Sequence, residues 1–383
     1  MNTPPIHAKD SPPDRLERLL GYLDSDPTNV TLLGDAAACA FDAQRFDLCD
    51  ELLIRQQARG TSTPASMNLY GLCAMARGKF DEALRAFAAL PDHDRNPVIR
   101  YNKAYAHAML SQFDEATGLL DEDVWTAVPQ AIALRMRALH HLGRLDEVIE
   151  LGKRYADHPE AGPEICGLLA TALFDSEDVA GAAQFASRAM SLPDGLAVNG
   201  LLALNEGSST EALALFSRAL AIRPDNSRAL LGTGLALLEQ HRFEEAAQQI
   251  DTAALAFRSH AGSWVAAGWA YLLKGDLVQA RARFEQGGSV DRGFAEVPGA
   301  LAIVALKEGR LDDARAQTKI ALRLDPGCLS AALAQALIEV QAGNQANANT
   351  LLDTALKRPI DAQGNTIERA LSRKFSQMGK SFR

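Results

Sequence analysis

The sequence is poor in aromatic residues, which make up 6% of its 383 residues although 47% are hydrophobic. A globular core normally fills its volume with large side chains, whereas much of the apolar content of this chain is alanine. Alanine favours helices and lets their backbones approach closely, so the composition predicts close-packed helices. The high apolar fraction also excludes an intrinsically disordered chain.

Paired cysteines, basic charge and long hydrophobic runs are scarce as well. The five cysteines include no CxxC pair, so neither a zinc site nor a disulfide framework is predicted. A formal charge of −9 disfavours a nucleic-acid binder, because neutralising phosphates needs a basic surface. The longest nearly uncharged apolar stretch, Ala261 to Leu273, is shorter than the ~18 residues that predict a membrane span. Residues 1 to 14 contain no apolar core typical of a secretory signal, and we expect a cytoplasmic protein.

The sequence is instead dominated by an internal repeat. Segments such as GKFDEALRAFAAL from Gly78 and EGRLDDARAQTKIALRLDPG from Glu308 share a turn, an acidic helix start, and alanine followed four positions on by an apolar residue. Ten such repeats follow one another at spacings of 30 to 34 residues, which is typical of a solenoid of helix pairs. They start at Val30, Pro64, Pro97, Pro129, Pro163, Pro193, Ser227, Ala261, Ala295 and Leu329.

Small residues recur at fixed positions of the repeat. Position 8 is Gly or Ala in nine of the ten repeats, with Met136 as the exception, and position 20 is Ala in eight. These positions lie on two successive helices, so we expect each pair to cross closely. Position 15 is Gly in six repeats, where a helix C-terminus favours a left-handed residue. These glycines are Gly78, Gly143, Gly207, Gly275, Gly309 and Gly343.

The pattern resembles the tetratricopeptide repeat family over roughly Val30 to Ala362. In AGSWVAAGWAYLLKGDLVQARARF, the family's Trp, Gly, Tyr, Ala and aromatic positions are occupied by Trp264, Gly268, Tyr271, Ala280 and Phe284. The resemblance implies an all-α fold, a right-handed superhelical solenoid of antiparallel helix pairs whose first helices line a concave groove. It also implies that Trp264 belongs to the core.

The organisation we expect has four parts. Residues 1 to 13 form a disordered segment, residues 14 to 29 hold a capping helix over Asp14 to Leu23, and residues 30 to 362 form about ten repeats. Residues 363 to 383 form a basic amphipathic helix. Cys39, Cys49 and Cys73 occupy positions that require small core residues. Trp125 lies in a segment, Asp121 to Gln130, that reads as a loop.

In tetratricopeptide proteins, positions 2, 5, 9, 12 and 13 of the first helix face the groove. The first half of the chain places a mixed set there, and the second half places a nearly uncharged apolar set there. An open apolar strip of that length should be covered by a partner, whereas the alternative is that these side chains pack against neighbouring repeats. The expected groove residues are Met75, Tyr101, Tyr105, Met109, Arg137, His140, Leu201, Leu231, Leu235, Leu238, Trp269, Leu272, Ile303, Leu306 and Leu337. No three consecutive repeats carry the Lys, Asn and Arg set with which the heat-shock-chaperone type of domain grips an acidic C-terminus.

The C-terminal segment has its own amphipathic pattern. Residues 357 to 383 hold seven basic and two acidic residues, and an apolar stripe follows helical spacing. This helix either caps the last repeat or docks in the groove, on a partner or on a membrane surface. The stripe consists of Ile367, Leu371, Phe375, Met378 and Phe382.

Signals for catalysis and cofactors are weak throughout. Gly232-Thr233-Gly234 lacks the third glycine and the preceding strand of a dinucleotide loop. His140 and His141 point about 100° apart on a helix, and no carboxylate or cysteine completes a metal site. We therefore expect no enzyme activity, no cofactor and no metal.

Three function classes remain. The leading one is a scaffold or chaperone that binds an apolar or amphipathic segment of another protein in its groove. The second is a regulatory sensor gated by a peptide or by the tail, and the third is an RNA-binding helical repeat, which the acidic charge opposes. The sequence does not specify an oligomeric state.

Overall fold

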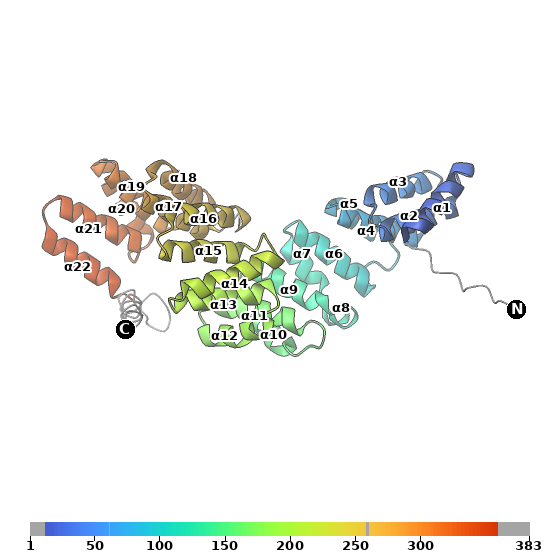
Figure 1. Cartoon of the computed structure of the whole chain (residues 1–383), viewed down its shortest axis with the longest axis horizontal. Helices are drawn as coiled ribbons and strands as arrows, with labels where there is room; N and C mark the ends of the chain where they lie inside the picture. Colours follow the sequence, from blue (N-terminus) through green and yellow to red (C-terminus); the bar gives the residue numbers. More distant parts are fainter. Residues whose placement is uncertain (1–11, 61, 258–259, 359–383) are drawn as a thin grey trace. The chain divides into compact units, whose positions relative to one another are not determined.

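The computed structural model describes residues 12 to 60, 62 to 257 and 260 to 358. The expected disordered segment, apart from its last two residues, and the C-terminal stripe lie outside these residues. The described part contains 22 α-helices and no strand, so the predicted all-α fold of helix pairs is confirmed (Figure 1). The chain divides into two compact units, Met1–Ile165 and Cys166–Arg383. Each unit is described by itself.

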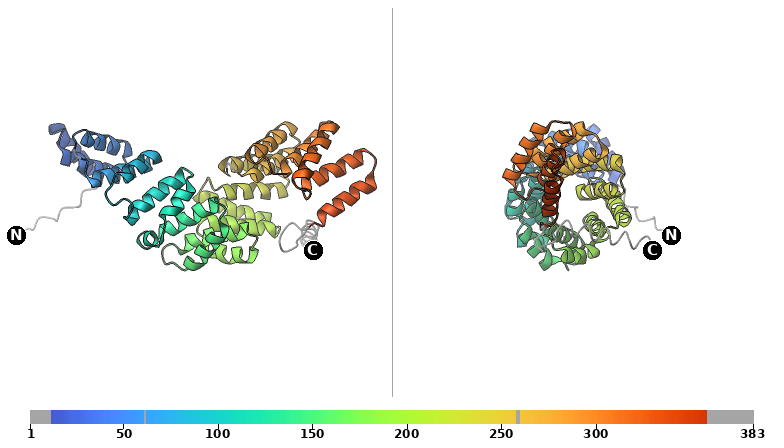
Figure 2. Two further views of the ribbon diagram at one scale, coloured as in Figure 1. Left: turned by 180° about the vertical axis from the view of Figure 1, so that it is seen from behind. Right: turned by 90° about the vertical axis from the view of Figure 1, so that its left-hand side faces the viewer.

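The N-terminal unit begins with a single helix followed by four helix pairs, with one short helix inserted between the third and fourth pairs. In each pair we call the earlier helix the first helix and the later one the second helix. Consecutive helices of the pairs pack side by side within the unit, and the inserted helix packs against the first helices of the third and fourth pairs (Figures 1 and 2). The single helix is α1 (Pro12–Ser25) and the inserted one is α8 (Glu122–Ala127); the pairs are α2 (Val30–Asp42) with α3 (Phe46–Gln57), α4 (Pro64–Ala76) with α5 (Phe80–Ala88), α6 (Pro97–Met109) with α7 (Phe113–Leu119), and α9 (Gln130–His141) with α10 (Leu145–Tyr155).

The C-terminal unit contains six further pairs. The earliest of their helices, α11, includes the boundary between the two units. The second helices α14 and α20 end two residues before Pro224 and Pro326, because proline cannot continue a helix. The pairs are α11 (Gly162–Asp175) with α12 (Val179–Ala186), α13 (Pro193–Asn205) with α14 (Ser209–Ile222), α15 (Ser227–Glu239) with α16 (Phe243–Phe257), α17 (Ala261–Lys274) with α18 (Leu277–Val290), α19 (Glu296–Lys307) with α20 (Leu311–Leu324), and α21 (Leu329–Gln341) with α22 (Gln345–Leu356).

The two helices of a pair cross where position 8 meets position 24. A Cβ added to Gly268 would lie under 3.0 Å from the ring of Phe284, which is fully buried. A side chain at Gly268 would therefore push α17 and α18 apart. The alanines at position 20 lie beside this crossing and are all fully buried. The same contact recurs between Gly71 and Phe87, Gly200 and Phe216, and Gly234 and Ile250.

Position 15 is left-handed in every repeat. The six glycines predicted there have φ between 71° and 91°, which confirms the prediction. The other four repeats place a residue with a side chain in the same conformation, although L-residues pay roughly 1–2 kcal/mol for it. The repeat geometry therefore overrides the local preference of Gln44, Ser111, Glu177 and His241.

Two features of the fold differ from a uniform array. Trp125 does not lie in a loop, as the sequence suggested, because α8 forms there with the Asp121 carboxylate accepting a hydrogen bond from the Val124 N–H. Val124 is fully buried, so an apolar contact holds this short helix against the core. In the fifth repeat, the second helix continues into a 3-10 turn at Ser187–Ala189.

The core runs along the helix pairs rather than forming one central volume. Near the N-terminus, Leu16 and Leu23 of α1 share a buried cluster with Leu33 of α2, so the first pair is covered by α1. Cys39, Cys49 and Cys73 are buried, in agreement with the prediction of small core residues. Trp264 is also buried, with 8% of its surface exposed.

Replacing the strained side chains at position 15 with glycine should stabilise the protein. We expect Gln44→Gly and Ser111→Gly each to raise the free energy of unfolding by about 0.5–1 kcal/mol. Glycine removes the left-handed strain, but it also increases the conformational entropy of the unfolded chain, which offsets part of the stabilisation. Urea denaturation followed by circular dichroism measures the change. The matched control is Ala43→Gly, where φ is −82°, and it should not stabilise. An equal gain in the control would show that left-handed strain is not the cause.

Filling the crossing point should have the opposite effect. Gly268→Ala should lower the free energy of unfolding by about 1–3 kcal/mol, because the new methyl group overlaps the ring of Phe284. A double variant with Phe284→Leu should lose less stability than the sum of the two single variants. Additive losses would show that the two residues do not meet as described.

Candidate binding surface

One face of α6 exposes a stripe of large apolar side chains. Val98, Tyr105 and Met109 are 51%, 37% and 52% exposed. Their spacing of seven and then four residues places them on one side of the helix, and Tyr101, three residues after Val98, lies beside them. We call Val98, Tyr101, Tyr105 and Met109 the α6 stripe. Soluble proteins seldom expose so many adjacent large side chains without a binding role.

Neighbouring helices hold the α6 stripe in place. The ring of Tyr105 meets Phe80 of α5 edge to face, with centroids 6.4 Å apart. Tyr101 is half-buried and packs against the cluster that contains Leu120 and Val124. Burial raises the pKa of Tyr101, and the nearby Tyr105 and Glu164 raise it further, so its hydroxyl remains protonated at neutral pH. The stripe is thus supported from below and open on its outer side.

Polar groups follow on the next first helix, α9. The Arg137 guanidinium donates from Nη2 to Oε1 of Glu164 at 2.8 Å, which joins α9 to the start of α11. His141 stacks flat on Phe113, with ring centroids 4.4 Å apart. Burial lowers the pKa of His141, and the charges of His140 and Arg137 lower it further. His141 is therefore neutral at pH 7. The guanidinium of Arg137 supplies positive charge beside it.

A cavity of ≈550 Å³ lies between the first helices of the first two repeats. Its wall includes positions 2, 5 and 9 of both α2 and α4, where glycine and alanine leave room. At Gly34, a Cβ would lie 2.8 Å from Nε2 of Gln56, an amide that donates to the Val30 carbonyl. The lining residues are Val30, Thr31, Gly34, Asp35, Ala38, Leu53, Gln56, Thr63, Ala65, Ser66, Asn68, Leu69 and Leu72.

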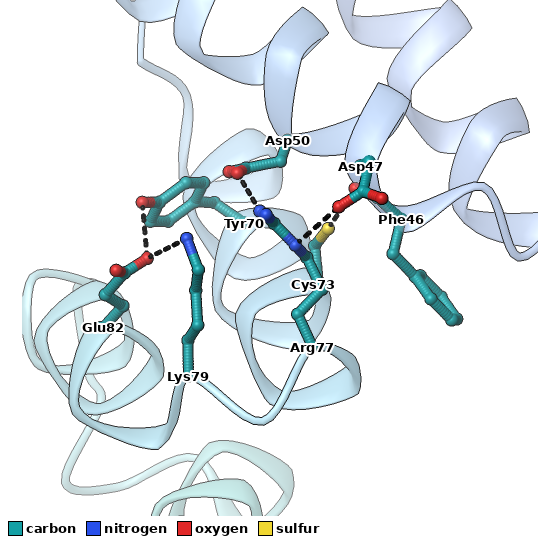
Figure 3. A network of polar contacts seen from close by, with 8 residues as sticks. All are labelled: Phe46, Asp47, Asp50, Tyr70, Cys73, Arg77, Lys79 and Glu82. Atoms are coloured by element: carbon teal, nitrogen blue, oxygen red, sulfur yellow. Dashed lines mark hydrogen bonds and ion pairs between the residues drawn. The ribbon is translucent and has the colours of Figure 1, made fainter.

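A separate polar network joins α3, α4 and α5 (Figure 3). Arg77, which follows α4, donates to Asp50 and lies 3.1 Å from Asp47 through its Nε atom. On the other side of α4, the Tyr70 hydroxyl donates to Glu82 at 3.4 Å. These bonds fix α4 against both second helices. The network is a structural feature and contains no arrangement of a nucleophile with a base.

The apolar strip expected in the second half of the chain is largely closed. Ile303 and Leu306 are 4% and 7% exposed, so their assignment to an open groove is wrong. They are buried because consecutive first helices approach closely: Gly299 of α19 has no room for a Cβ beside the backbone of Ala331. Three further predicted groove residues pack against the buried cluster that contains Ile303 and Leu306. They are Trp269, Leu272 and Leu337.

The other predicted residues of the C-terminal unit are half-buried. This set comprises Leu201, Leu231, Leu235 and Leu238, which lie between repeats and keep part of their surface accessible. Met75, Arg137 and His140 of the N-terminal unit are half-buried in the same way. Among the predicted apolar groove residues of the N-terminal unit, Tyr105 and Met109 are the exposed ones, and both lie on α6.

Sequence reasoning missed two exposed residues. Val98 occupies position 2 of its repeat and Leu273, 54% exposed, occupies position 13 of its repeat, and both positions face the groove in the family. Reading every groove position of each repeat would have identified them. The predicted tail residues, from Ile367 to Phe382, lie outside the described residues.

Within the described ranges, no cluster of His, Cys, Asp and Glu has the composition of a metal site. In the same part of the chain, no helix is long and apolar enough to cross a membrane.

Tetratricopeptide repeat models match three segments of the sequence, residues 71–132, 203–266 and 300–364. Together with the ten helix pairs, these matches show that the chain belongs to the tetratricopeptide repeat family. Repeats of this family generally mediate protein–protein interactions, and its members are typically non-catalytic scaffolds. No curated protein matches the chain.

Solved structures give the same fold at low sequence identity. The crystal structure of the APC/C hetero-tetramer Cut9–Hcn1 has a chain that matches with a TM-score of 0.51 and 14% identity, over 89% of this chain and 75% of that one. Human IFIT1, solved as a dimer with m7Gppp-AAAA, matches with a TM-score of 0.51 and 14% identity, over 92% and 96% of the two chains. At these identities the likeness shows the fold alone.

The charge environment of His141 can be tested directly. Arg137→Met should raise the pKa of His141 because a nearby positive charge is removed, but the pKa should stay below the usual histidine value because burial remains. NMR titration of the imidazole signals measures both effects. Arg144→Met is the control, since Arg144 pairs with Glu147 instead. An unchanged His141 titration in Arg137→Met would contradict the assignment.

Proposed function

We propose that this protein is a non-enzymatic scaffold or chaperone in the cytoplasm that holds an apolar or amphipathic segment of another protein against its first helices. The observation that carries the proposal is the α6 stripe, which exposes an aromatic, a methionine and a branched aliphatic side chain on one face. The cavity between α2 and α4 and the cation of Arg137 lie on first helices of the same unit and supply further contacts.

The energetics require the partner to contact more than one repeat. Burying a large apolar side chain completely contributes roughly 1.5–3 kcal/mol, and the exposed residues of the α6 stripe are already partly buried. Association costs roughly 4–15 kcal/mol before any net affinity appears. Three anchors therefore give weak binding, and a stable complex needs a segment that also reaches neighbouring first helices, as an amphipathic helix or an extended chain does.

The two other function classes have less support. A peptide- or tail-gated sensor would use the same surface, and it would in addition require two arrangements of the repeats that differ in affinity for the peptide or tail. RNA binding has a precedent in the fold, since the human IFIT1 dimer was solved with m7Gppp-AAAA. A formal charge of −9 opposes it here, because affinity for a phosphate backbone depends on basic side chains.

Site-specific photo-crosslinking tests the proposal. A photoreactive phenylalanine analogue placed at position 105 in living cells should crosslink to a discrete protein partner. Ile54 of α3 is the matched control position, because it is 51% exposed in the same unit but lies on a second helix. The analogue at position 54 should give no such product.

The crosslink should depend on the α6 stripe. Met109→Glu should reduce the yield at position 105 by about tenfold or more, because a charge replaces a buried anchor at the interface. Circular dichroism should show that the variant is folded, since Met109 is 52% exposed. Equal yields at positions 105 and 54, or an unchanged yield in the folded variant, would contradict the proposal.

A further inference from the structure

A cavity in the C-terminal unit is lined by two second helices and one first helix. It measures ≈290 Å³ and is lined by α16, α17 and α18. Its volume is near the lower end of the roughly 300–1,000 Å³ found for ligand sites, which is enough for one or two side chains. The lining residues are Asp251, Leu255, Trp264, Ala282, Arg283 and Gln286.

Two unusually exposed apolar side chains lie at or near this cavity. Among the large hydrophobic residues that the structure describes, Val278 at 75% and Leu255 at 65% have the highest exposed fractions. Leu255 lines the cavity, and Val278 lies one helical turn before the lining residue Ala282, on the same side of α18. The cavity therefore has apolar side chains both at its edge and beside it.

The charged residues of the wall neutralise one another. The Arg283 guanidinium donates from Nε and Nη2 to the two carboxylate oxygens of Asp251, at 2.7 and 2.8 Å. The Tyr271 hydroxyl donates to the same carboxylate at 2.8 Å. An ionic ligand would meet no unpaired charge here and would lose its hydration, so the cavity favours an uncharged ligand.

Two residues of the wall carry polar groups that suit a peptide backbone. The indole Nε1 of Trp264 is buried and has no acceptor among the described residues. A buried donor left unpaired costs roughly 1–3 kcal/mol, so a ligand carbonyl that reaches it gains this energy. Gln286, exposed on α18, carries an amide that can both donate and accept.

We propose that this cavity binds an aliphatic side chain of a partner polypeptide, with the carbonyl of that residue accepting from the Trp264 indole. The amide of Gln286 pairs with the partner's main chain. Because Nε1 has no exposed surface in the free protein, a side chain of the wall must move to admit the carbonyl. Leu255, which is largely exposed, can move at little cost. This second interaction site is independent of the α6 stripe.

Peptide titration of the full-length chain labelled with ¹⁵N-tryptophan tests the site. The probes are two capped hexapeptides, acetyl-GSLLSG-amide and acetyl-GSEESG-amide. Variants Trp125→Phe and Trp269→Phe assign the Trp264 indole signal by elimination. We expect the leucine peptide to shift this signal saturably downfield, as a newly accepted hydrogen bond does, and the glutamate peptide to bind about tenfold more weakly or not at all.

Three variants distinguish binding in this cavity from binding elsewhere on the protein. Leu255→Glu should weaken the leucine peptide at least about tenfold, whereas Ile222→Glu, at a residue 53% exposed on α14, should leave it unchanged. Tyr105→Glu should also leave the affinity for the leucine peptide unchanged. The proposal for this cavity and the proposal for the α6 stripe can therefore fail independently.

Three results would overturn the proposal. The first is a Trp264 signal that does not move with the leucine peptide. The second is an equal shift in Leu255→Glu. The third is a change of oligomeric state in Leu255→Glu, measured by light scattering, without any peptide effect, which would make this surface a contact between copies of the chain.

Discussion

The fold depends on one steric constraint, the close crossing of the two helices in each pair. Where position 8 is glycine, the ring or branched side chain at position 24 lies directly on the helix backbone, as Phe284 lies on Gly268. Phe216 shows how this contact links neighbouring repeats, since a Cβ at Gly200 of its own repeat or at Gly232 of the next would overlap its ring. Small residues therefore fix both the pair and the stacking of pairs.

The same close packing decides which side chains remain available for binding. In the C-terminal unit, consecutive first helices approach so closely that Ile303 and Leu306 become core residues. In the N-terminal unit, the short α7 and the inserted α8 interrupt the regular pairing after α6. The α6 stripe is left with Tyr105 and Met109 exposed. The α6 stripe thus lies where the repeat departs from its regular form.

The repeat period could be predicted from the sequence because each helix pair requires the same residue types at the same positions. A glycine such as Gly275 at position 15 and an alanine such as Ala280 at position 20 each satisfy a geometry within one helix pair. Exposure depends on the distance between successive first helices, which no single repeat encodes. Leu235 and Ile303 both occupy position 9, yet the first is half-buried and the second is 4% exposed. The cavity at Trp264 could not be predicted for the same reason, because its walls come from three helices of two repeats.

The central claim is that a partner segment is held on first helices of the N-terminal unit. Hydrogen–deuterium exchange of the full-length protein, alone and with the partner identified by crosslinking, tests this most directly. We predict that protection on binding is concentrated in the first helices α2, α4, α6 and α9, with the second helices α7 and α10 unchanged. Protection confined to the second helices, or no change in α6, would contradict this claim.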